Sequence, residues 1–153
     1  MKTYAQTLVS EEELRLFRYV QVLLEELPDV DLGEDLEGHP FLMSCHILVR
    51  ALVQHIGADK VKFVDGRLYP FFDHSWLVTL AGNIIDVYPV ATIGGPIMIL
   101  AENSQAAHHY LTNVPPPIQR SYEKRFNLEC FQRAVELTVM SLAESTVIFI
   151  PEV

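Results

Sequence analysis

The chain contains few of the residues that mark several common classes of protein. Its 153 residues include only two cysteines, Cys45 and Cys130. That number is too small for a disulfide scaffold in a domain of this length, although one bridge between them is an alternative. No Cys-x-x-Cys or His-Glu-x-x-His spacing occurs, and the adjacent His108 and His109 would point in different directions on a helix. The sequence therefore predicts reduced thiols, no metal and no organic cofactor.

Basic residues and long apolar runs are also scarce. Eleven Lys and Arg stand against 20 Asp and Glu, for a formal charge of −9, whereas binding to a nucleic-acid backbone relies on clusters of Lys and Arg. No uninterrupted apolar run approaches the roughly 20 residues of a membrane span. The first residues, Met-Lys-Thr-Tyr-Ala-Gln, form no apolar signal region. We therefore expect no nucleic-acid partner, no membrane partner and a cytoplasmic location.

Half of the residues are hydrophobic, which allows a substantial core, and no linker or repeat divides the chain, so we expect one domain over 1–153. Residues 10–27 predict an amphipathic helix, with Ser10 as N-cap, Glu13 completing a capping box and Pro28 ending it. Further elements are expected as strands at 60–64 and 67–71 around an Asp65-Gly66 turn, strands at 74–79, 83–90 and 97–100, helices at 103–112 and 121–143, and a strand at 146–150. This order predicts an α+β fold, an antiparallel sheet packed against helices.

Cys45 lies in a segment whose apolar residues recur at helical spacing, and Gly57 is a suitable C-terminal stop. The helix can begin at Pro40, because proline is favoured in the first turn, or after Ser44 acting as N-cap. Only the second start places Cys45 at the helix tip. There the backbone N–H groups and the helix dipole would favour a thiolate and contribute to an oxyanion hole.

His74 and Asp86 lie on two segments that a hairpin would join. A three-residue loop, Leu80-Ala81-Gly82, fits a type I turn followed by a left-handed glycine. In that register His74 and Asp86 are diagonal neighbours on one face, about 7–8 Å apart at their Cα atoms. The alternative two-residue loop, Gly82-Asn83, would turn Asp86 away from His74.

These residues match the needs of thiol catalysis. A thiol attacks a carbonyl only as thiolate, so an imidazole must take its proton, and a carboxylate must orient the imidazole and stabilise its charge. Cys45, His74 and Asp86 are the candidates for nucleophile, base and orienting group. Trp76 and Tyr88 share the face of His74 in the favoured register; we expect Trp76 to shield the His74–Asp86 bond and Tyr88 either to bind substrate or simply to pack.

The order of these motifs resembles the transglutaminase-like cysteine hydrolase superfamily, a branch of the papain-like fold. The resemblance covers about residues 38–90: a Cys at the head of a helix, His74-Ser75-Trp76-Leu77, a short Gly-containing turn, and Ile84-Ile85-Asp86. It implies a peptidase, amidase or acyltransferase that acts on a peptide or protein substrate. Where many relatives carry Trp beside the nucleophile and an acidic residue soon after His-x-Trp, this chain has Ser44-Cys45-His46 and Val78.

A second interpretation assigns no catalysis. A lone Cys on an apolar helical stripe is most often a small buried hydrophobe. Much of the negative charge lies in the first forty residues, including the run from Asp29 to Glu37. The alternative is therefore an acidic protein-binding module, similar to an inhibitor or antitoxin, whose acidic surface docks a basic partner.

Overall fold

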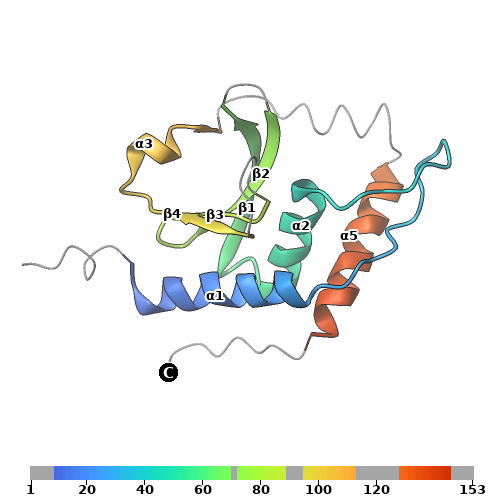
Figure 1. The fold of residues 1–153 in the computed structure, drawn as a ribbon, viewed down its shortest axis with the longest axis horizontal. Coiled ribbons are helices and arrows are strands. Elements are labelled where there is room, and N and C mark those ends of the chain that lie inside the picture. The colour runs from blue at the N-terminus through green and yellow to red at the C-terminus, as the bar shows by residue number, and fades with distance from the viewer. Residues whose placement is uncertain (1–8, 70–71, 89–94, 113–127, 146–153) are drawn as a thin grey trace, which may run out of the picture.

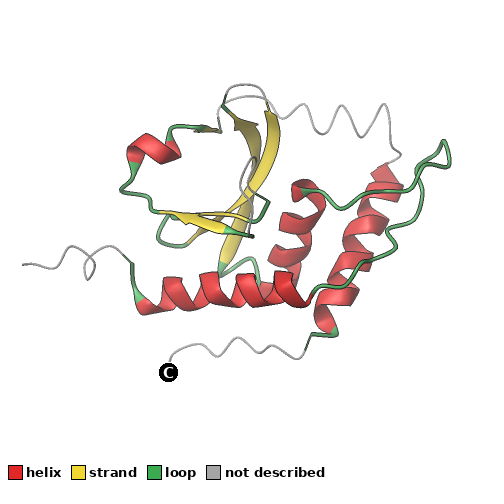
Figure 2. Cartoon of the chain, in the orientation of Figure 1, coloured by secondary structure: helices red, strands yellow, loops and turns green. Residues whose placement is uncertain are grey.

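The computed structural model describes residues 9–69, 72–88, 95–112 and 128–145 (Figure 1). In this part of the chain four helices pack with a curled five-stranded antiparallel sheet, which confirms the predicted α+β class (Figure 2). The sheet order is β4-β3-β2-β1-β5. The elements are α1 (Glu11–Glu26), α2 (Cys45–Ile56), β1 (Val61–Leu68), β2 (Phe72–Thr79), β3 (Ile84–Asp86), β4 (Ile97–Ile99), α3 (Ser104–Ala107), β5 (Tyr110–Leu111) and α5 (Leu128–Ala143).

The core forms where α2 meets both the sheet and α5. Helix α2 packs against β1 and β2 with one side and against α5 with another, and α1 runs past the ends of these elements (Figure 1). All but four of the twelve residues of α2 are buried, as expected for a central helix that is apolar on most of its surface. The fully buried side chains include Val20, Leu23, Ile47, Val49, Leu52, Val61, Leu77, Ile85 and Leu142.

The β2–β3 hairpin has the predicted register. Val78 pairs with Ile84 and Leu77 with Ile85, and the amide of Gly82, at φ +84°, donates to the carbonyl of Thr79. Glycine adopts this left-handed conformation without the steric cost that a Cβ imposes. Because side chains alternate along a strand, this register places Asp86 on the same face as His74.

The carboxylate of Glu13 connects α1 to this hairpin. Glu13 is buried and accepts hydrogen bonds from the Thr79 hydroxyl, from the Ala81 amide at 3.2 Å and from the Asn83 side chain at 3.1 Å. Ser10 caps α1 as predicted, by accepting from the Glu13 amide at 3.1 Å. The second half of the expected capping box is wrong, because the Glu13 side chain binds the hairpin loop.

The predicted turn at Asp65-Gly66 is also wrong, because both residues lie inside the continuous strand β1, opposite Ser75 and His74. Gly66 is required there by close packing, not by a turn. A Cβ at this position would lie 2.7 Å from the Trp76 ring and closer still to the Leu111 carbonyl. A glycine in a strand often marks such a close approach.

Other boundaries differ from the predictions. Of the helix expected at 103–112, only α3 is α-helical, and residues 110–111 instead form β5 on the outer edge of β1. Strand β3 ends at Asp86, and β4 confirms a strand after Gly95-Pro96. The described part of helix α5 is Leu128–Ala143; the remainder of the expected long helix and the strand at 146–150 lie outside the described residues. Within the described ranges, no helix is long and apolar enough to cross a membrane.

Candidate cysteine site

Cys45 is the first residue of α2, as the Ser44 alternative predicted. Ser44 has extended backbone angles, and its hydroxyl accepts from the Ile47 amide at 3.4 Å. The first backbone N–H groups of a helix have no acceptor within the helix, and the helix dipole adds partial positive charge there. The thiol therefore lies where negative charge on sulfur is favoured.

His74 and Asp86 form a buried hydrogen-bonded pair. His74 Nε2 lies 2.9 Å from Asp86 Oδ2, and the two side chains are 2% and 0% exposed. The same carboxylate accepts from the Tyr110 hydroxyl at 2.7 Å and from the Tyr88 amide at 3.1 Å. Burial and the nearby carboxylate raise the pKa of Tyr110, so its hydroxyl keeps its proton and donates it. Three donors thus hold Asp86 as an oriented carboxylate.

The second hydrogen-bond partner of the His74 ring is Cys45. The two side chains are hydrogen-bonded, and because Nε2 is engaged by Asp86, Nδ1 is the nitrogen left for the sulfur. Burial alone would raise the pKa of the Cys45 thiol, but hydrogen bonds from His46 and His74 lower it to about 6. Burial would lower the pKa of His74, but Asp86 and then Cys45 raise it to about 9. Between these values the favoured state is thiolate and imidazolium.

The sulfur is enclosed, and polar groups lie close to it. Cys45 is 7% exposed, yet within the described part of the chain it does not belong to the main hydrophobic cluster. Its neighbours include the imidazoles of His46 and His74 and the Ser75 backbone. These groups stabilise an anion, whereas the packed hydrocarbon around a structural cysteine disfavours one. Cys130 is the other free cysteine and lies on α5.

A second polar network also reaches Cys45. His46 Nδ1 lies 3.8 Å from the sulfur and 2.6 Å from Ser75 Oγ. Ser75 in turn donates to Asp65 Oδ1 at 2.5 Å, and Arg50 holds both carboxylate oxygens of Asp65 at 3.0 and 2.5 Å. This network was not predicted, because Asp65-Gly66 has the composition of a turn, whereas in the structure the β1–β2 register sets Asp65 opposite Ser75.

Trp76 and Tyr88 have different surroundings. Trp76 is 1% exposed, stacks on His74 at 6.2 Å and meets Tyr110 edge-on at 5.1 Å between ring centroids. Trp76 therefore packs against the His74 and Tyr110 rings; its role in shielding the His74–Asp86 hydrogen bond stays a prediction. Tyr88 lies beyond the end of β3 and is 59% exposed, so its side chain does not pack beside His74; its amide, not its hydroxyl, is what reaches Asp86.

A largely apolar cavity of about 420 Å³ is lined by residues that include sequence neighbours of Cys45 and Asp86. Met43 precedes Cys45 by two residues, Val87 follows Asp86, and Tyr88 also contributes.

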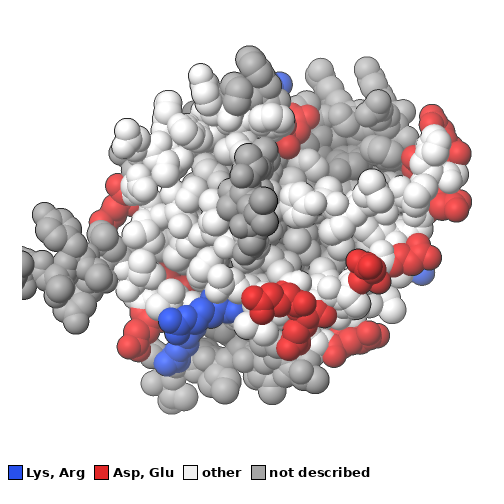
Figure 3. Space-filling model, in the orientation of Figure 1, with Lys and Arg blue, Asp and Glu red and all other residues white. Residues whose placement is uncertain are grey.

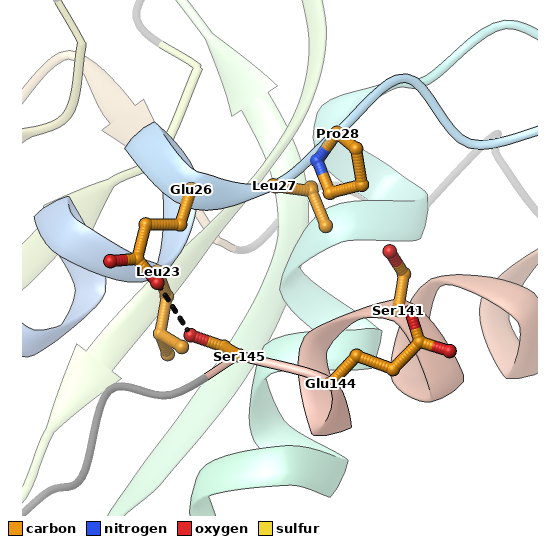
Figure 4. A pocket seen from close by; sticks show the side chains of 7 residues that line it. All are labelled: Leu23, Glu26, Leu27, Pro28, Ser141, Glu144 and Ser145. Atoms are coloured by element: carbon orange, nitrogen blue, oxygen red, sulfur yellow. Dashed lines mark hydrogen bonds between the residues drawn. The ribbon is translucent and has the colours of Figure 1, made fainter.

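A second cavity, of about 400 Å³, lies between the C-terminal ends of α1 and α5. It is lined by residues of those two helices and of the chain beyond them, and Ser145 donates a hydrogen bond to Glu26 there (Figure 4). The described residues contain no group of three or more side chains placed to hold a metal ion.

The acidic segment 29–37 forms a loop, and two of its carboxylates accept hydrogen bonds from nearby backbone amides. Asp31 accepts from the Gly33 amide, and Asp35 accepts from the amides of Glu37 and His39. Acidic groups outnumber basic ones on the face shown in Figure 3. Two of the carboxylates therefore have a structural role in the loop, and a docking role for the others stays a prediction.

Comparisons of the chain with models of known protein families, with curated proteins and with solved structures each gave no match. The fold and the site are therefore interpreted from their own geometry. The class that this geometry defines is an α+β domain with a buried Cys-His-Asp arrangement at a helix N-terminus.

Proposed function

We propose that the protein is a cysteine-dependent acyl hydrolase or acyltransferase, of the transglutaminase-like kind that its motifs resemble. The observation that carries the proposal is the continuous hydrogen-bonded series from Cys45 through His74 to Asp86. Its two outer members are buried beside polar partners, and Asp86 also binds Tyr110 and Tyr88. A lone structural cysteine would need none of these groups.

In the proposed reaction, the Cys45 thiolate attacks the carbonyl carbon of an amide or thioester, and a carbon–sulfur bond forms. Negative charge moves to the carbonyl oxygen, where the Cys45 backbone N–H donates to it. Collapse of this intermediate breaks the bond to the leaving group, which takes a proton from the His74 imidazolium. His74 then deprotonates water or an acceptor amine, which attacks the thioester and releases the thiolate. Asp86 keeps the ring oriented throughout.

The apolar cavity beside Met43 and Tyr88 supports a place for the chain of the acyl donor. Among its lining residues, Met43 lies two residues before Cys45 and Val87 directly follows Asp86, and apolar walls suit a hydrophobic side chain of a substrate. We propose a peptide or protein substrate with such a residue. Replacement of Tyr88 by alanine should then raise KM for a substrate with a large apolar residue and leave the reactivity of Cys45 toward iodoacetamide unchanged.

Acyl transfer to the enzyme is tested with p-nitrophenyl acetate in a Cys130→Ala background. We expect release of p-nitrophenol together with addition of one acetyl group to Cys45, detected by intact mass and peptide mapping and reversed by hydroxylamine. Cys45→Ala should abolish the adduct, and His74→Ala should slow its formation. Acetylation that persists in Cys45→Ala, or a protein that gains no acetyl group while still folded by circular dichroism, would refute the proposal and favour the acidic binding module.

A further inference from the structure

His46 also contacts the sulfur, and its hydrogen bonds define its protonation. A carboxylate only accepts, so the single hydroxyl hydrogen of Ser75 is used on Asp65 at 2.5 Å. The Ser75 oxygen must then act as acceptor toward His46 Nδ1, 2.6 Å away. His46 therefore carries a proton on Nδ1, the same atom that lies 3.8 Å from the Cys45 sulfur.

This assignment separates the two imidazoles by role. An Nδ1 that already holds a proton cannot remove one from the thiol, so His74 alone can act as base. The N–H of His46 can instead donate to the sulfur when the sulfur is negative, because hydrogen bonds to a charged form favour it. The 3.8 Å contact is within the range for a sulfur acceptor, with Ser75 as the closer partner.

The support behind His46 is rigid. Arg50 binds Asp65 through two nitrogens and also donates to the His46 carbonyl at 3.0 Å. Its guanidinium lies 4.5 Å above the Phe63 ring centroid. An Arg–carboxylate pair of this bidentate form fixes the direction of both groups. The carboxylate oxygen that receives the Ser75 hydroxyl therefore has a defined position, as does the hydroxyl itself.

We propose that His46 is a positioning residue, held with a proton on Nδ1 by Ser75 and Asp65, and that it stabilises the Cys45 thiolate independently of His74. The inference deepens the proposed function, since it concerns the same sulfur. It does not need turnover to be tested, because the state of the thiol can be measured directly. Among the described residues, the ionisable side chains that connect to the sulfur directly or through a series of hydrogen bonds are His46 and Arg50 from α2, Asp65 from β1, His74 from β2, Asp86 from β3 and Tyr110 from β5.

The experiment measures the rate of iodoacetamide alkylation of Cys45 against pH, in the full chain with Cys130→Ala. Loss of one charge-assisted hydrogen bond should raise the apparent pKa of Cys45 by about one unit in His46→Leu, which lowers the rate at pH 6 by about fivefold. His46→Asn, which keeps a side-chain N–H near the same place, should restore most of the rate. The matched control is His55→Leu, about 14 Å further along the same helix, which should leave the profile unchanged.

Two further measurements test the proposal even if His46→Leu fails to fold. Ser75→Ala removes the acceptor that holds the proton and should also raise the apparent pKa. In ¹⁵N-labelled parent protein, the ring nitrogen shifts of His46 should report the Nδ1–H tautomer. An Nε2–H tautomer, or alkylation profiles of His46→Leu and Ser75→Ala that overlay the parent, would overturn the inference. If His74→Ala alone moves the profile, this inference fails and the proposed function stands; if Cys45 is not alkylated in the parent, the proposed function itself fails.

Discussion

Replacement of Asp86 by asparagine removes the negative charge behind His74 with almost no change of shape. The pKa of His74 lies at about 9 instead of 6.5, and one unit is equivalent to about 1.4 kcal/mol. Burial lowers this pKa, so Asp86 and Cys45 outweigh burial by a net amount on the order of 3 kcal/mol in favour of the imidazolium. Asp86 raises this pKa more than Cys45 does, so its hydrogen bond and charge should supply the larger share.

Without that charge, the imidazolium that stabilises the thiolate is itself less stable. We expect the pKa of His74 in Asp86→Asn to fall toward its ordinary range, because burial is then opposed by Cys45 alone of the two groups. The apparent pKa of Cys45 should rise from about 6 by roughly two units, which reduces the thiolate fraction at pH 7 about tenfold. Proton NMR titration of the His74 ring and thiolate absorbance at 240 nm, both in Cys130→Ala, measure the two values.

The matched control is Asp73→Asn, one residue before His74 on β2. Asp73 is 42% exposed and lies 3.9 Å from Arg67, so the same change of charge should leave both titrations unchanged. The reasoning would be refuted by an Asp86→Asn protein whose thiol and ring titrate as in the parent. An equal effect of Asp73→Asn would also refute it, since net charge and not contact would then be responsible.

Three further predictions concern stability, measured by chemical denaturation. The lowered pKa of Cys45 adds stability as pH rises from about 6 to its unfolded value, while the raised pKa of His74 adds stability that is lost as pH rises toward about 9. The two slopes should cancel between about pH 6.5 and 9, so a difference between the parent and the Cys45→Ser/His74→Gln double variant that slopes steadily across this window would contradict the ion pair. Glu13→Ala should cost about 2–4 kcal/mol, because three donors in the hairpin loop lose their acceptor; an effect no larger than that of the exposed Glu12→Ala would contradict the assigned role. Gly66→Ala should cost about 1–3 kcal/mol through steric overlap, and an unchanged unfolding midpoint would show that the strand can shift.

The parts of the site that were predictable depend on local rules. The loop length and the glycine at its third position fix the β2–β3 register, and this register decides whether His74 meets Asp86. The place of Cys45 follows from one cap, since Ser44 before an apolar helical pattern starts the helix at the next residue. Both inferences use fewer than fifteen consecutive residues, within which backbone geometry leaves few alternatives.

The parts that were missed depend on packing between distant segments. Tyr110 reaches Asp86 across 24 residues of sequence because β5 pairs with the outer edge of β1, whereas residues 103–112 carry a local helical pattern. Asp65-Gly66 has the composition of a turn, yet the glycine is there to admit Trp76 and the Leu111 backbone. Composition alone does not distinguish a glycine needed for its backbone angles from one needed for its missing side chain.

The central claim is that His74 converts Cys45 into a thiolate at neutral pH, and a short iodoacetamide pulse at pH 7 followed by intact mass and peptide mapping tests it most directly. The account predicts that Cys45 is alkylated before Cys130, and that His74→Ala slows the modification of Cys45 while that of Cys130 keeps its rate. Alkylation of Cys130 first, or a Cys45 rate that is the same in the parent and in His74→Ala, would contradict it.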